Sequence, residues 1–254
     1  MIEYINPLLI CAVVLYFGAG AVFISKRKKT AITVLVAAWF VNVVVMVLNG
    51  IMVNDIPMGN MYQVQVVLSL CFPPLLLLLA WRDKLAWTAV YFACASALPL
   101  IGAVFMDKQG GWKRMPALQS GWFVPHVLAY MIAYALCTVA FIMLLRMWLG
   151  KRHRVEYRRA IYTILRTAFP FMTFGLLSGA LWAEEAWGQY WSWDPKEVWS
   201  LITWGLYLVY FHCRKSPWKN STDWAHLLAF LALLTTFFLV NLLPKLGSIL
   251  HSYA

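Results

Sequence analysis

The feature that most constrains this chain is a series of long apolar runs separated by short polar segments. The runs cover residues 5–25, 31–53, 62–80, 86–105, 124–148, 161–181, 197–213 and 223–243. A hydrocarbon core of about 30 Å requires about 20 apolar residues when a helix crosses it, whereas barrel strands alternate over only about 10. The sequence therefore predicts an all-α, polytopic membrane protein with about eight transmembrane helices, which form a single helical membrane domain over residues 1–254.

The composition excludes a soluble globular domain. Hydrophobic residues make up 63% of the 254 positions and charged residues only 12%. Polar side chains are therefore too few to cover a surface exposed to water. The lipid bilayer is the expected solvent of this chain.

The placement of the basic residues predicts how the chain is oriented. The net charge is +11, and 16 of the 21 Lys and Arg residues lie in segments that alternate with the spans. These segments are Lys26 to Lys29, Arg82 with Lys84, Arg146 to Arg166, and Arg214 to Lys219. This alternation is the positive-inside pattern, so the charge does not indicate a nucleic-acid partner. Both termini are predicted to lie on the outer, periplasmic side, together with segments 54–61, 106–123 and 182–196.

The cysteine pattern excludes two further classes of protein. The five cysteines lie within or at the ends of the apolar runs, and the chain contains neither a CxxC pair nor a CxxCH motif. A disulfide framework is therefore not expected, and the chain is not itself a cytochrome with covalently attached haem.

The segment 182–199 is unusually rich in tryptophan and in acidic residues. It holds five of the fourteen tryptophans and four of the ten acidic residues. Asp194, Pro195 and Glu197 have the spacing of a capping box with proline at the first helical position, which accounts for part of the pattern. Tryptophan is also common at membrane interfaces. Five in one connection nevertheless favour a flat aromatic surface for a large, planar and mostly apolar ligand.

Several motifs in this chain resemble one known family. The run Trp187 to Glu197 resembles the tryptophan-rich WWD signature of haem-handling proteins. Further matches are Pro116 to Ser120, Trp122, His126, the ending His251 to Tyr253 and, more weakly, Pro57, Asn60 and Tyr62. Together they resemble the CcsA (ResC) branch of System II cytochrome c biogenesis over about residues 54–254. The chain departs from that pattern at Gln63, where the family has Glu, and at Ala254, where it has Gly.

The resemblance implies a set of haem-binding residues. His126 and His251 match the paired external histidines that ligate haem iron, and the predicted topology places both on the outer side with the WWD segment. His212 matches a transmembrane histidine, although its position at a helix end also suits a simple capping role. Trp187, Trp191, Trp193 and Asp194 would contact the haem. His153 is expected to lie in a solvated loop, and nothing in the family pattern supports a role for His226.

The function implied by the resemblance is export and presentation of haem. The chain would accept haem b without covalent attachment, hold it at the outer face, and present it to the CxxCH thiols of apocytochrome c. Enzymatic activity would belong to a cytochrome c synthase (haem lyase) complex formed with a separate CcsB or ResB partner in the membrane. A thioredoxin-like thiol reductant is a candidate third partner. The membrane would be the bacterial inner (plasma) membrane, or the thylakoid membrane if the gene is plastid-encoded.

Three alternatives remain open from the sequence. A System I-type haem-loading protein carries a related signature, but Pro116 to Ser120 and the C-terminal motif argue against it. A dihaem anchor of a respiratory complex typically carries two histidines on one helix, whereas a charged loop separates His212 from His226. A transporter or channel unrelated to haem would be colourless when purified.

Overall fold

The structure is a computed structural model that describes residues 2–108, 116–150, 153–218 and 221–239. Helices make up almost all of these residues. The α-helices of these residues are α1 Ile2–Ile24, α2 Lys28–Val53, α3 Met61–Asp83, α4 Ala89–Phe105, α5 Phe123–Leu149, α6 Arg154–Trp187, α7 Pro195–Lys215 and α8 Thr222–Leu234. Three short helical segments accompany them, namely η1 Ala86–Thr88, η2 Pro116–Gln119 and η4 Thr235–Leu239. The all-α prediction is therefore confirmed.

Not every helix is long and apolar enough to cross a membrane. Six segments meet that requirement by length and composition, and they comprise α1 to α6. The apolar helix Thr222–Phe238 is shorter. Helix α7 carries Lys196 and Glu197 in its first turn and Arg214 and Lys215 in its last turn. The structure therefore supports a multi-span membrane protein, although within residues 2–108, 116–150, 153–218 and 221–239 fewer helices than the eight predicted reach the full criterion.

The chain divides into two compact units, residues 1–115 and 116–254. In the first unit, α1 packs against α2 and α4, and α3 packs against α4. Polar side chains join these helices inside an apolar core, where Asn42 donates to Ser69 Oγ at 2.8 Å and Ser69 donates to the Ser96 carbonyl at 2.7 Å. Such interhelical hydrogen bonds hold helices together in lipid, where burial of apolar surface supplies no drive for association.

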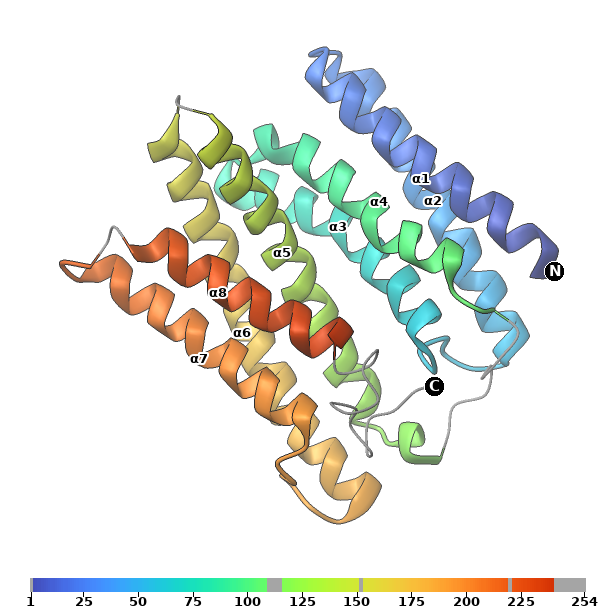
Figure 1. Cartoon of the computed structure of the whole chain (residues 1–254). Helices are drawn as coiled ribbons and strands as arrows, with labels where there is room; N and C mark the ends of the chain where they lie inside the picture. The colour runs from blue at the N-terminus through green and yellow to red at the C-terminus, as the bar shows by residue number, and fades with distance from the viewer. Residues whose placement is uncertain (1, 109–115, 151–152, 219–220, 240–254) are drawn as a thin grey trace. The chain divides into compact units, whose positions relative to one another are not determined.

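The second unit is built from α5 to α8, which run alternately up and down (Figure 1). The start of α6 and the start of α8 lie at one end, where Arg158 Nη2 and Asp223 Oδ2 form an ion pair at 2.7 Å. The start of α5, the end of α6 and the start of α7 lie at the opposite end. The end that holds residues 182–199 is called the tryptophan-rich end. The end that holds Arg158 and the last residues of α7, Arg214 and Lys215, is called the basic end.

Helix α6 is much longer than the predicted span 161–181. Its 34 residues correspond to about 51 Å at 1.5 Å per residue. A hydrocarbon core is only about 30 Å thick, so one or both ends of α6 extend beyond it. The tryptophan-rich segment is consequently largely helical, and only residues 188–194 lie between α6 and α7.

Candidate functional site

His126 lies in the first turn of α5 and faces α6. Its Nδ1 lies 2.8 Å from the carbonyl oxygen of Gly175. A carbonyl can only accept, so Nδ1 carries the proton and the lone pair of the neutral ring is on Nε2. The ring also packs against Trp182, at 5.4 Å between centroids, and against Tyr130 at 5.1 Å. Helix α6 thus fixes both the orientation and the tautomer of this imidazole.

Two glycines of α6 leave the space that the side chains of His126 and Tyr130 occupy. A Cβ atom at Gly179 would lie 2.6 Å from Cε1 and 2.7 Å from Nδ1 of His126. A Cβ atom at Gly175 would lie 3.0 Å from the ring of Tyr130. Both distances are shorter than an ordinary carbon contact of about 3.5 to 4.0 Å. Close packing of α5 on α6 therefore depends on these small residues, as is common between membrane helices.

Trp182 connects His126 to the tryptophan-rich segment. Its side chain is buried, and its ring lies edge-to-face with Trp187 at 5.1 Å. Its indole N–H donates to the carbonyl of Ala117 at 2.7 Å, and Ser120 hydrogen-bonds Glu185. The motif at residues 116–120 is therefore attached to the end of α6.

The sequence reading did not select Trp182, Gly175 or Gly179 as site residues. A usable signal was present, because two glycines four residues apart on a membrane helix mark a close helix contact. The partner of that contact, His126, could not be identified from the spacing alone.

The tryptophans around the α6–α7 connection are not coplanar. Trp191 and Trp193 meet at 87° with 5.8 Å between ring centroids, and Trp182 and Trp187 meet at 69°. Trp193 has a φ of 59° and is 71% exposed. The indole nitrogen of Trp191 is buried and has no acceptor among the described residues. These side chains form an edge-to-face cluster, in which the Trp191 indole nitrogen is a donor left unsatisfied by the described residues, rather than the flat surface expected from the sequence.

The predicted capping box at the start of α7 is confirmed. The Asp194 side chain accepts from the backbone N–H of Lys196 at 2.9 Å, and Glu197 accepts from the backbone N–H of Asp194 at 3.2 Å. Glu197 also accepts from the backbone N–H of Ser192 at 2.8 Å. Both carboxylates are buried. Through these hydrogen bonds the two carboxylates fix the conformation of the α6–α7 connection. Contact of Asp194 with haem stays a prediction.

Lys196 lies beside this cap, just before the predicted span 197–213. Burial lowers the pKa of its ammonium group to about 7, while the Asp194 carboxylate opposes that shift. Burial therefore favours the neutral amine of Lys196 more than water does. An anionic group bound nearby would raise this pKa and favour the charged form.

The remaining histidines occupy different surroundings. His212 is exposed near the end of α7, and its Nδ1 lies 2.9 Å from the Leu208 carbonyl. His226 is fully buried on α8 against the rings of Tyr207 and Tyr210, at 5.9 and 6.0 Å. His212 and His226 therefore face different neighbours and do not pair across the helix hairpin.

His153 is exposed and lies 3.1 Å from Glu156, which agrees with a solvated position. His251 lies outside the described residues, so its pairing with His126 stays a prediction.

These features define a class of protein, a helical membrane protein that holds an imidazole beside a tryptophan cluster. The profile of the family described as "Cytochrome C assembly protein" matches residues 7–247. The chain therefore belongs to the cytochrome c assembly protein family, which associates it with cytochrome c maturation.

Curated relatives agree with this assignment. The chain is 29% identical over 287 residues to the cytochrome c biogenesis protein CcsA of Mesostigma viride, covering 96% of this chain and 93% of that protein. It is 30% identical over 249 residues to CcsA of Synechococcus sp. (strain CC9902), covering 78% and 77%. It is 32% identical over 215 residues to CcsA of Chlamydomonas reinhardtii, where it spans only 60% of that protein's length. The resemblance to the CcsA branch is thereby confirmed.

Proposed function

We propose that this protein binds haem at the tryptophan-rich end of its second unit and presents it for attachment to apocytochrome c. The observation that carries this proposal is the placement of His126, whose Nδ1 is held by Gly175 and whose ring lies on Trp182. A metal-binding histidine usually has its second nitrogen fixed by a carbonyl or carboxylate in this way. His251 would supply the opposite axial ligand, as the family resemblance implies.

The tryptophan cluster supports binding of a large, planar and mostly apolar ligand that has polar groups at its edge. Trp187 and Trp191 supply apolar surface, and Trp193 is largely exposed at the cluster's rim. The buried N–H of Trp191 is a donor without an acceptor among the described residues, and burial of such a donor is costly. A haem carboxylate could accept from it, which would remove that cost on binding.

The contribution to thioether formation is mainly positional. Each thiol of the CxxCH motif adds to a haem vinyl group, so a sulfur–carbon bond forms and the thiol proton is transferred to the other vinyl carbon. Holding the two reactants in place can lower the barrier by about 7 to 11 kcal/mol without an acid or base. The capping hydrogen bonds of Asp194 and Glu197 suit this role, because they make the α6–α7 connection rigid.

We further propose that haem reaches this site from the cytoplasmic side, with His212 as a ligand on the way. A CcsB- or ResB-type partner would provide the second ligand there and would complete the System II synthase. Candidate membranes are the bacterial inner membrane and the thylakoid membrane, since the relatives include cyanobacterial and plastid-type CcsA proteins.

The purified protein is expected to carry haem with a low-spin Soret spectrum. The measurement is an absorption spectrum of the chain purified in detergent, with and without a co-expressed partner.

Joint replacement of Trp187, Trp191 and Trp193 by Ala should remove most of the haem and leave the protein in the membrane. A colourless parental protein in both preparations would contradict the proposal and would favour a transporter.

The topology is expected to place residue Ala254 outside the cytoplasm and Lys151 inside it. The reason is the asymmetric distribution of basic residues, 16 against 5, between the two sets of connections. Fusions of a periplasm-active and a cytoplasm-active reporter at these two positions test the orientation. Cytoplasmic reporter activity at Ala254 would reverse the assignment of the tryptophan-rich end to the outer face.

A further inference from the structure

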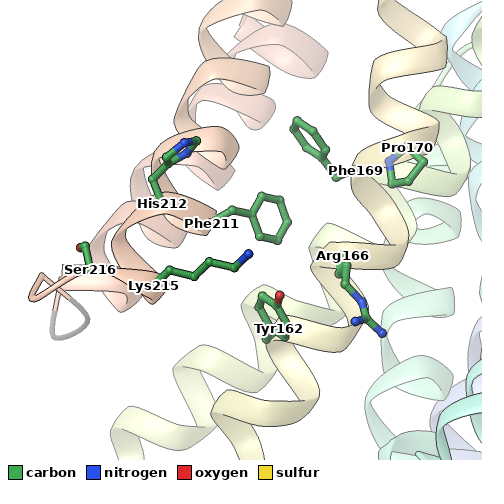
Figure 2. Close-up of a pocket in the computed structure, with 8 residues that line it drawn as sticks. All are labelled: Tyr162, Arg166, Phe169, Pro170, Phe211, His212, Lys215 and Ser216. Atoms are coloured by element: carbon green, nitrogen blue, oxygen red, sulfur yellow. The ribbon is translucent and has the colours of Figure 1, made fainter.

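A cavity of about 460 Å³ lies between α6 and α7, toward the basic end of the second unit (Figure 2). Its volume is within the range of about 300 to 1,000 Å³ found for sites of small organic ligands. Successive turns of α6 and the last turns of α7 form its two walls. The lining residues are Tyr162, Arg166, Phe169, Pro170, Phe211, His212, Lys215 and Ser216.

The deeper part of the cavity is aromatic. Phe169 lies 5.3 Å from Phe211 between ring centroids, and it stacks on Trp204 at 5.7 Å. Trp204 also donates from its indole nitrogen to Thr173 Oγ1 at 3.0 Å. These contacts close the space between α6 and α7 toward the tryptophan-rich end. An apolar ring system inserted here would lie against Phe169 and Phe211.

The mouth of the cavity is cationic. Lys215 extends from α7 toward α6 between Phe211 and Tyr162, whereas the side chain of Arg166 leaves α6 and points away from Lys215 (Figure 2). The guanidinium carbons of Arg166 and Arg214 lie 5.9 and 4.4 Å from the centre of the Tyr162 ring. None of the described residues that line the cavity is acidic, so these positive charges lack a counter-charge within it.

His212 adds to this amphipathic cavity an imidazole, a side chain that can ligate a metal. Its Nδ1 donates to the Leu208 carbonyl, which places the lone pair of the neutral ring on Nε2. A ligand that satisfies all three features has an apolar planar body, a metal that accepts imidazole, and anionic groups along one edge. An iron porphyrin with two carboxylates has these properties.

We infer that Arg166 and Lys215 bind the two carboxylates of a haem whose iron is ligated by His212. The inference rests on the proposed haem-handling function but concerns a site other than that of His126. The charged pair orients the haem, with its carboxylate edge toward the basic end and its apolar edge toward Phe169. It also selects porphyrins with free carboxylates over neutral ones, because a guanidinium binds a carboxylate through charge-assisted hydrogen bonds.

The test compares haem with its dimethyl ester, in which both carboxylates are neutral. Each is titrated into the full-length protein, and the absorption component that is lost in a His212→Gly variant reports the α6–α7 site. Arg166→Gln with Lys215→Gln should weaken haem binding to this component by roughly tenfold or more. The same double variant should bind the ester as the parent does. Arg159→Gln is the matched control, because Arg159 is an exposed cation on α6 that does not line the cavity.

Three results would overturn the inference. One is equal loss of haem and ester in the double variant, which would indicate general damage to the cavity. Another is unchanged haem affinity together with lost binding of phosphatidylglycerol, which would make the cations a lipid headgroup site. The third is the absence of any His212-dependent component while haem persists on His126, which would leave the proposed haem site at His126 intact and remove His212 from the haem path. Absence of haem from every preparation would instead refute the proposed function itself.

Discussion

Replacing His126 by glycine should lower haem occupancy at the tryptophan-rich end by roughly tenfold or more, since even loss of a supporting residue around a metal ligand typically costs about 10- to 100-fold. The haem that remains should become five-coordinate, because one axial position is opened. The helix contact should survive the change. The Gly175 carbonyl still accepts from Ser178 Oγ at 3.2 Å, so no buried carbonyl loses all of its partners. The measurements are haem content per protein, the Soret position and the yield of mature cytochrome c.

Free imidazole distinguishes loss of a ligand from loss of the fold. The glycine variant leaves a space of the size of the missing ring beside Trp182, so added imidazole should restore part of the low-spin spectrum. The matched control is His153→Gly, because His153 is exposed and its φ of 63° is a conformation that glycine readily adopts. An unchanged spectrum in His126→Gly would remove this residue from the proposed site. Loss of haem without rescue by imidazole would indicate that His126 is needed for packing instead.

Replacing Gly179 by alanine should have an effect nearly as large, although this residue has no side chain to contact haem. The added methyl group would lie 2.6 Å from Cε1 of His126, so the ring has to move away from α6. That movement breaks or lengthens the hydrogen bond between Nδ1 and Gly175. Haem affinity should fall by about 10- to 100-fold, as is typical when the residues that orient a metal ligand are disturbed. The checks are a haem titration and the low-spin fraction in the spectrum.

Gly205→Ala provides the matched control for this prediction. Gly205 lies in α7 of the same unit, and a Cβ atom there would meet no atom within 4 Å. Both substitutions replace glycine by alanine in a helix and gain about 0.5 to 1 kcal/mol of intrinsic helix stability. They differ only in the clash with His126. Equal haem affinity in the two variants would show that His126 is not held in its position by α6.

The helices themselves were predictable because their causes are local. In lipid every backbone N–H and C=O must be satisfied within the segment, so a run of about 20 apolar residues is sufficient to specify a helix. The bounds of α1 to α5 agree with the predicted spans to within a few residues. The capping box was predictable for a similar reason, since Asp194 and Glu197 are three positions apart and act on adjacent backbone groups.

The ends of α6 were less predictable. Hydropathy marks where a helix enters lipid, whereas its hydrogen bonds continue in water until a residue such as Gly188 ends it. The polar turns before residue 161 and the acidic turn around Glu184 are therefore helical although they lie outside the predicted span. Trp187 consequently projects from a helix, and only residues 188–194 connect α6 to α7.

By itself the sequence determined that this protein is helical, lies in a membrane and carries the signature of cytochrome c assembly proteins, because run length and motif are properties of the local chain. Only the tertiary structure decided which side chains meet. The hydrogen bond from His126 spans 49 positions to Gly175, and that from Trp182 spans 65 positions to Ala117. The cavity between α6 and α7 likewise depends on how two helix faces pack. Such contacts follow from the shape of side chains on separate helices, which no periodicity within one helix encodes.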